Sequence, residues 1–144
     1  MAGLISDALP KVINAKTHSI IDYIHAGTNF VAGALFRKNN PRASNAAYAL
    51  GAAVLVNALC TDYQLGVLRL WSFRVHGMLD YGVAATSAVL PPLLQIQDTP
   101  EAKYFYGQGG GETVIAGITD YNDDSGSHRV GAIDIREFRE RKIA

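Results

Sequence analysis

The sequence predicts an all-α protein, a four-helix transmembrane bundle built from two tandem helical hairpins. Three observations lead to this prediction. The chain matches itself without gaps at an offset of 58 residues, which indicates a duplication. It contains four long apolar stretches that are nearly free of Lys and Arg. Turn-forming residues stand between the two stretches of each repeat, at Asn39-Asn40-Pro41 and Asp98-Thr99-Pro100.

The repeat is most evident in its polar residues. Chance would give about three or four identities over a stretch of this length, and they would not be clustered. Instead, a His-x-x-x-Asp-Tyr motif and a later Thr-Asp-Tyr motif occur once in each copy. The first copy carries them at His18, Asp22, Tyr23, Thr61, Asp62 and Tyr63, and the second at His76, Asp80, Tyr81, Thr119, Asp120 and Tyr121.

Four helices are expected in order along the chain, over residues 17–36, 43–60, 75–96 and 102–118. The first two form hairpin repeat 1, residues 17–63, and the last two form hairpin repeat 2, residues 64–121. An N-terminal segment, residues 1–16, precedes them, and a polar tail, residues 122–144, follows. Within the tail, residues 134–142 have the spacing of a short amphipathic helix.

The apolar segments favour a membrane environment, because they lack the charge periodicity of helices that face water on one side. A soluble four-helix bundle is the alternative, since the mean hydropathy is only +0.07. If all four helices span, the positive-inside rule places both termini in the cytoplasm of a bacterium, with the protein in its inner membrane. The side with the termini carries Lys11, Lys16, Arg69, Arg74, Arg129, Arg136, Arg139, Arg141 and Lys142, and the other carries Arg37, Lys38, Arg42 and Lys103.

The composition excludes several classes of function. The formal net charge is zero, whereas a nucleic-acid partner would require a basic excess. Cys60 is the only cysteine, so the chain forms neither an intrachain disulfide nor a cysteine-based metal cage. The N-terminus lacks the basic region and apolar core of a secretory signal.

Two stretches carry a family resemblance. Residues 59–66 read Leu-Cys-Thr-Asp-Tyr-Gln-Leu-Gly, and residues 75–82 read Val-His-Gly-Met-Leu-Asp-Tyr-Gly. In this Thr-Asp-Tyr-x-Leu-Gly turn followed by a His-x-x-x-Asp helix, the chain resembles the bacterial SPW-repeat proteins. The resemblance implies a small integral membrane protein with four helices in two repeats. The Ser-Pro-Trp motif that names the family is absent, and the family implies no activity or residue roles.

The duplicated motif predicts a polar cluster at one end of the bundle. His18 and Asp22 are four residues apart and therefore lie on one face of their helix, as do His76 and Asp80. Because each repeat contains two helices, both copies begin at the same end, where Asp62 and Asp120 also close their helices. The candidate cluster comprises His18, Asp22, Tyr23, His76, Asp80, Tyr81, Asp62 and Asp120.

Three interpretations of this cluster are open. The side chains could satisfy one another and lock the hairpins together. His18, Asp22, His76 and Asp80 could instead bind Zn, Mn or Fe, or both histidines could ligate a haem. The cluster could also belong to a proton or ion path. His25 and His128 have no counterpart in the other copy, which argues against their belonging to a symmetric site.

The function that these residues favour is that of a non-enzymatic structural or accessory subunit, in contact with lipid and associating with itself or with a larger membrane complex. No nucleophile–base pair or cofactor motif is present, so no catalytic residue and no cofactor is predicted. The alternatives are a metal- or haem-binding redox membrane protein that uses the duplicated His/Asp pairs, and a small ion or proton transporter.

Overall fold

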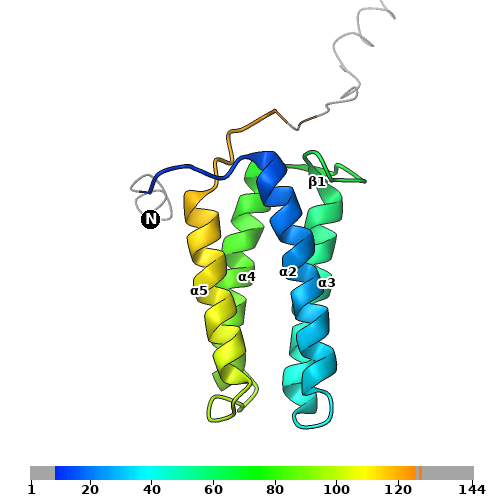
Figure 1. Cartoon of the computed structure of the whole chain (residues 1–144), viewed down its shortest axis with the longest axis vertical. Coiled ribbons are helices and arrows are strands. Elements are labelled where there is room, and N and C mark those ends of the chain that lie inside the picture. Colours follow the sequence, from blue (N-terminus) through cyan, green and yellow to red (C-terminus); the bar gives the residue numbers. More distant parts are fainter. Residues whose placement is uncertain (1–8, 126, 128–144) are drawn as a thin grey trace, which may run out of the picture.

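Four helices make up the fold, as predicted. A computed structural model describes residues 9–125 and residue 127, in which the helices are α2 (Ala15–Phe36), α3 (Pro41–Cys60), α4 (Phe73–Leu93) and α5 (Ala102–Ile118). They run side by side as two hairpins, α2 with α3 and α4 with α5 (Figure 1). The all-α bundle of two tandem hairpins is therefore confirmed. The tail helix predicted at residues 134–142 lies outside the described residues.

Local chemistry sets where the helices begin and end. Asn14 and Ser72, which are equivalent in the two repeats, cap α2 and α4 by accepting hydrogen bonds from backbone N–H groups of the first turn. Helix α4 ends at Leu93, earlier than predicted, and two consecutive prolines occupy its last turn. Gln95 then adopts a left-handed conformation with φ of 57°, which stops the helix.

The segments that flank the helices pair at one end of the bundle. Strand β1 (Thr61–Asp62) pairs in parallel with β2 (Trp71–Ser72), with Thr61 opposite Trp71. At the equivalent positions of the other repeat, Ile13 and Thr119 form a parallel bridge. The duplication thus extends to these connections, which bring the start of each repeat's first helix beside the end of the other repeat's second helix.

Glycines allow close helix approach at equivalent places in the two hairpins. A Cβ atom on Gly51 would lie 3.0 Å from the Cβ of Asn29 in α2, and one on Gly109 would lie 2.8 Å from the Ala84 carbonyl oxygen in α4. Small residues at such contacts let helix backbones pack closely, especially in membranes. Close packing within the two hairpins therefore depends on Gly51 and Gly109.

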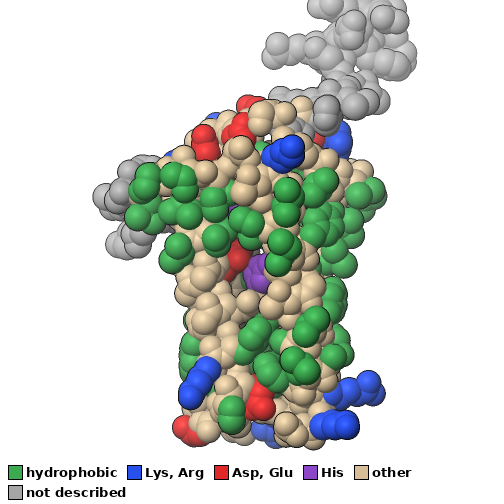
Figure 2. Space-filling model, viewed as in Figure 1, with side chains coloured by type: hydrophobic (Ala, Val, Ile, Leu, Met, Phe, Trp, Pro, Cys, Tyr) green, Lys and Arg blue, Asp and Glu red, His purple; other side chains and the backbone are tan. Residues whose placement is uncertain are grey.

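The interior combines many small and polar residues with a few large apolar ones such as Leu50 and Phe105, whereas many large aliphatic residues are exposed. Helix α2 buries His18, Ser19, Asp22 and Asn29 together with Ala and Gly, but no large aliphatic residue. Figure 2 shows apolar side chains over the sides of the bundle and charged ones gathered at its two ends. The exposed apolar positions of the helices include Ile20, Ile24, Val31, Leu35, Val56, Met78, Val89, Leu93 and Val114.

Only α3, among the described helices, is by itself long and apolar enough to cross a membrane, with a mean hydropathy of 1.4 over its most apolar window. By this measure the sequence expectation of four spans is matched by one helix. The buried polar residues of α2 and α4 explain part of the difference, because they lower the mean hydropathy of helices whose outer faces are apolar.

Candidate metal centre

Two histidines and two aspartates meet inside the bundle near the end that carries the strands. His18 and Asp22 come from α2, and His76 and Asp80 come from α4. Their exposed fractions are 0%, 3%, 1% and 4%, respectively. The i, i+4 spacing places each pair on the inward face of its helix. Gly77 leaves room for the Tyr121 ring, which would lie 2.7 Å from a Cβ at that position.

The four side chains face one another at short distances. The Nε2 atoms of His18 and His76 are 3.1 Å apart, and Asp80 Oδ2 lies 3.1 Å from each of them. Asp22 bridges the same two nitrogens from the other side, with Oδ1 3.3 Å from His18 Nε2 and Oδ2 3.2 Å from His76 Nε2. One ligand-type atom from each residue lies within 4.8 Å of all the others.

Two threonine hydroxyl groups fix the tautomer of the two histidines. Thr119 Oγ1 donates to the Ile115 carbonyl oxygen at 2.7 Å, so its lone pairs accept from His18 Nδ1 at 2.9 Å. Thr61 does the same in the other repeat, donating to the Asn57 carbonyl oxygen and lying 2.7 Å from His76 Nδ1. Each ring therefore carries its proton on Nδ1 and directs Nε2 into the cluster.

Two tyrosines hold the carboxylates. Tyr63 donates to Asp22 Oδ2 at 2.7 Å, and Tyr121 donates to Asp80 Oδ2 at 2.8 Å. Burial and the neighbouring aspartate charge raise the pKa of both phenols above that of a free tyrosine, so both remain hydrogen-bond donors. Each carboxylate is thus oriented by a residue of its own repeat, whereas each histidine is oriented by a threonine of the other repeat.

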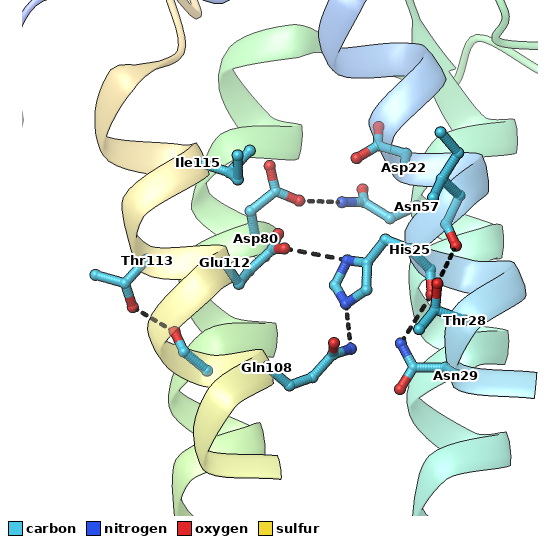
Figure 3. Close-up of polar contacts among 12 residues, drawn as sticks. Asp22, His25, Thr28, Asn29, Asn57, Asp80, Gln108, Glu112, Thr113 and Ile115 are labelled. Atoms are coloured by element: carbon cyan, nitrogen blue, oxygen red, sulfur yellow. Dashed lines mark hydrogen bonds and ion pairs between the residues drawn. The ribbon is translucent and has the colours of Figure 1, made fainter. Parts of the chain in front are cut away.

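One part of the surrounding shell breaks the symmetry. Asn57 donates to Asp80 Oδ1 at 3.1 Å (Figure 3), and its own Oδ1 accepts from Trp71 Nε1 at 3.1 Å. At the equivalent positions the other repeat has Ile115 and Ile13, which offer no side-chain hydrogen bond. Asp80 is therefore held more firmly than Asp22.

Hydrogen-bond chemistry restricts what can occupy the centre. With Nδ1 protonated, a neutral imidazole presents a lone pair at Nε2, and an ionised carboxylate has only acceptor oxygens. The centre then contains four acceptors that face one another and carry two formal negative charges. Such a buried group requires a compensating cation, supplied either by protons on the imidazoles or by a metal ion.

The other residues of the predicted cluster lie around the centre but do not enter it. Tyr23 donates to the Leu65 carbonyl oxygen, Asp62 accepts from Ser127, and Asp120 accepts from the backbone N–H of Asn122. Tyr81 is half-buried on α4 next to Asp80. In the Thr-Asp-Tyr motif, the threonine and the tyrosine contact the centre, and the aspartate between them does not.

The sequence prediction named the aspartate of the Thr-Asp-Tyr motif, whereas the structure brings the threonine and the tyrosine of each copy to the centre. A usable signal was present, because successive side chains of an extended segment point to opposite sides. Thr61 and Tyr63 therefore share a side that excludes Asp62, and the same holds for Thr119 and Tyr121. Asn57 could not be found from the repeat, since its counterpart is Ile115.

A second polar group lies farther along α2, between α2 and α5. His25 on α2 points across to α5, where its Nδ1 lies 3.0 Å from Glu112 Oε2 and its Nε2 contacts Gln108 (Figure 3). As predicted from its lack of a counterpart, His25 is not part of the symmetric centre. Glu112 is 7% exposed, and no duplicated motif identifies it.

The chain matches no family model, no curated protein and no solved structure. The resemblance to the SPW-repeat proteins stays a prediction.

Proposed function

We propose that this chain is a small membrane protein whose two helical hairpins are joined by one divalent transition-metal ion, bound by His18, Asp22, His76 and Asp80. The observation that carries this proposal is the pair of Nε2 atoms 3.1 Å apart, with Nδ1 of each ring hydrogen-bonded to a threonine hydroxyl whose own proton is already donated. Ligating histidines have this arrangement, because the outer hydrogen bond fixes the tautomer that ligates.

The competing interpretation is an ion-paired cluster without metal. For the imidazoles alone to neutralise both ionised carboxylates, each must carry a second proton, and the two Nε2–H groups then lie 3.1 Å apart. A divalent ion neutralises the two carboxylates and satisfies both nitrogen lone pairs without that opposition. The metal interpretation therefore accounts for the contacts with less electrostatic conflict.

The spacing suits a small ion with short bonds. An ideal tetrahedron with metal–ligand distances of about 2.0 Å has edges of about 3.3 Å, and His18 Nε2, His76 Nε2 and Asp80 Oδ2 are each 3.1 Å from one another. Asp22 completes the set, with a different oxygen near each of the two nitrogens, at 3.3 and 3.2 Å. Two imidazoles and two carboxylates suit Zn²⁺ best, with Mn²⁺ and Fe²⁺ as the other candidates. Haem ligation requires about 4 Å between the two nitrogens, so the geometry does not favour it.

A closed, four-ligand site favours a structural role over a catalytic one. Catalytic zinc keeps one coordination position for water or substrate, whereas structural zinc has protein ligands at all four positions. Here α2 and α4 each supply two ligands, and the threonine bonds cross between the repeats. The metal would therefore hold the two hairpins together, in keeping with a non-enzymatic membrane subunit.

The membrane part of the proposal is supported by the distribution of side chains. In water, so many exposed aliphatic side chains along the helices, beside an interior with many buried polar groups, would be unfavourable. In lipid the same distribution is favourable, because the apolar outer faces contact acyl chains while polar groups pair inside. Charged residues gather at the two ends of the bundle, as the headgroup regions require (Figure 2).

Elemental analysis of the purified chain in mild detergent tests the metal. We expect about one transition-metal ion per chain, and loss of that ion from the Asp22→Asn, Asp80→Asn double variant. The Asp62→Asn, Asp120→Asn double variant is the matched control, since both residues lie at the same end of the bundle but outside the centre, and it should retain the metal. A metal-free wild-type chain that also binds no added Zn²⁺, Mn²⁺ or Fe²⁺ would overturn the proposal.

A further inference from the structure

A groove of about 420 Å³ runs between α2 and α5, on the face that Figure 2 displays. Its walls are largely apolar, but a polar group stands in the middle, formed by His25, Gln108 and Glu112. Figure 3 shows these three side chains directed into the space between the two helices. The groove extends from Lys103, near the start of α5, to Ile21 and Ile115 beside the metal centre.

The duplication provides an internal comparison for this groove. A second groove, of about 570 Å³, lies between α4 and α3 at the equivalent positions. There, Val83 takes the place of His25 and Leu50 that of Gln108. The equivalent of Glu112 is Val54, which is buried in α3. The fold therefore accepts purely apolar residues at these positions, so the polar group is not required for helix packing.

The glycines on α5 divide into two kinds. Gly109 faces α4, where a Cβ would lie 2.8 Å from a backbone oxygen. Gly107 and Gly111 line the groove, and a Cβ on either would meet nothing within 4 Å. Close packing within this chain thus explains Gly109 alone. Gly107 and Gly111 keep the groove open beside His25 and Glu112.

Polar contacts connect the groove to the metal centre. Along the antiparallel pair α2 and α5, His18 contacts Thr119, His25 contacts Glu112, and Asn29 accepts from Tyr104 at 3.1 Å. His18 and His25 are seven residues apart, as are Glu112 and Thr119, so each pair lies on one helix face. The result is a line of polar groups that begins near the end of the bundle opposite the metal centre and leads to His18.

We propose that His25, Gln108 and Glu112 form an outer, exchangeable cation site on the route by which the metal ion reaches its centre. This inference rests on the proposed function. An imidazole and a carboxylate are ligand types that the same first-row ions accept. Gln108 contacts His25 through its amide nitrogen, and its amide oxygen would become the third ligand once an ion displaces that contact. Only one carboxylate is present, against two in the centre, so the outer site holds the ion more weakly and passes it inward.

The charges around the outer site agree with this assignment. Glu112 supplies its negative charge at 7% exposure, where low dielectric strengthens attraction for a cation. Lys103, the basic residue of the groove, lies at its outer end and is exposed, so its long side chain can extend into solvent away from an incoming ion. Asp22, which lacks the asparagine partner of Asp80, is the centre's carboxylate on α2, three residues from His25.

The test compares the rate of loading with the final affinity. Metal-free protein in lipid nanodiscs is mixed with Zn²⁺, and uptake is followed by competition with a fluorescent zinc indicator. The His25→Val, Glu112→Val double variant copies the equivalent residues Val83 and Val54, so it should fold as the wild type does. Charge-lined clefts raise association rates by about 10–10³-fold, and we therefore expect loading at least about tenfold slower, with the final affinity within about threefold of the wild type.

A second variant, Glu112→Gln, removes the charge and preserves the shape, and it should show the same slow loading. Equal loading rates in wild type and both variants would overturn the outer site while leaving the metal centre intact. A parallel loss of rate and final affinity would also overturn it, because the polar group would then belong to the centre's own support. Failure of the wild type itself to take up Zn²⁺ would instead contradict the proposed function, so the two failures are distinguishable.

Discussion

At the scale of single residues, the hydroxyl groups of Thr61 and Thr119 decide whether the two histidines are ligands. Each threonine donates to a backbone carbonyl oxygen and is therefore left with lone pairs for Nδ1–H of a histidine. A residue of similar shape without a hydroxyl would leave Nδ1–H unpaired in the interior. These two threonines would therefore be necessary for the proposed metal affinity, although neither belongs to the proposed ligand set.

We expect the Thr61→Val, Thr119→Val double variant to bind Zn²⁺ about 10–100-fold more weakly, the usual cost of losing partners that orient ligands. Competition with a chelator of known affinity measures the change. The matched control is Thr28→Val, Thr86→Val, which removes two exposed hydroxyls that bond only to their own helices. Equal affinities in both double variants would show that the threonines do not orient the ligands.

Tyr63 permits a second residue-scale prediction. Its hydroxyl donates to the buried Asp22 carboxylate at 2.7 Å, and hydrogen bonds to charged groups contribute about 1.5–3 kcal/mol. The Tyr63→Phe variant should lose about that much free energy of unfolding. Tyr23→Phe, whose lost bond is to an exposed backbone oxygen, should lose less than about 1 kcal/mol. Reversible unfolding in detergent measures both, and an equal loss would contradict the role given to Tyr63.

At the residue scale, the sequence was enough to predict the His/Asp centre but not the second polar group. The repeat and the i, i+4 spacing are enough to place His18, Asp22, His76 and Asp80 together, because helix geometry fixes which side chains share a face. The Glu112–His25 pair is different. It joins positions 87 residues apart on helices whose lateral packing no motif specifies, so only the three-dimensional structure reveals it.

At the scale of helices, the two glycines Gly109 and Gly110 provide a matched pair. They are neighbours in α5, but a Cβ on Gly109 would lie 2.8 Å from the Ala84 carbonyl oxygen, and one on Gly110 would meet nothing within 4 Å. Gly109→Ala should therefore cost about 1–3 kcal/mol through overpacking. Gly110→Ala should stabilise the helix by about 0.4–1 kcal/mol, because alanine loses less conformational freedom.

Thermal unfolding of the two variants under identical detergent conditions checks this prediction. The sign of the difference matters more than its size, since both changes add a methyl group to the same helix turn. If Gly109→Ala were as stable as Gly110→Ala, α4 and α5 would not approach as closely as described. Sequence patterns alone identify the glycine run but do not say which of its members faces α4.

Helix bounds were predicted to within two residues at every helix end except the end of α4. Helix α5 begins and ends where expected, and α2 and α3 begin two residues before the predicted starts. The exception is the end of α4, because apolarity continues through residues 94–96 while the backbone has already turned at Gln95. The hydrophobic pattern there reflects burial, whereas the left-handed backbone of Gln95 determines where the helix ends.

At the scale of the whole molecule, the proposed membrane location requires polar groups that pair inside the bundle and apolar side chains that face lipid. In a Cys60→Ala background, we expect Val31→Cys and Val89→Cys to resist a membrane-impermeant maleimide in intact membranes. Both positions are more than half exposed and should face lipid. Asn39→Cys, in the exposed turn between α2 and α3, should react from one side of the membrane. Reaction of Val31→Cys as fast as that of Asn39→Cys would indicate a water-soluble bundle.

The bundle as a whole could be predicted because, in a duplicated chain, the pattern of one hairpin also predicts the other. Each apolar segment has a counterpart, and two tandem hairpins of the same order bring equivalent helix ends to the same end of the bundle. The departures from this symmetry could not be predicted from the repeat. Asn57 supports one carboxylate and not the other, and one lateral groove is polar where its equivalent is apolar.

The most direct test of the metal centre is X-ray absorption at the zinc edge on protein loaded with one equivalent of Zn²⁺. We expect about four nitrogen and oxygen ligands at about 2.0 Å, with outer-shell scattering from two imidazole rings. The imidazole signal should disappear in the His18→Ala, His76→Ala double variant. A six-coordinate oxygen shell without imidazole scattering in the wild type would contradict the account, because zinc would then be bound at the surface and not between the two hairpins.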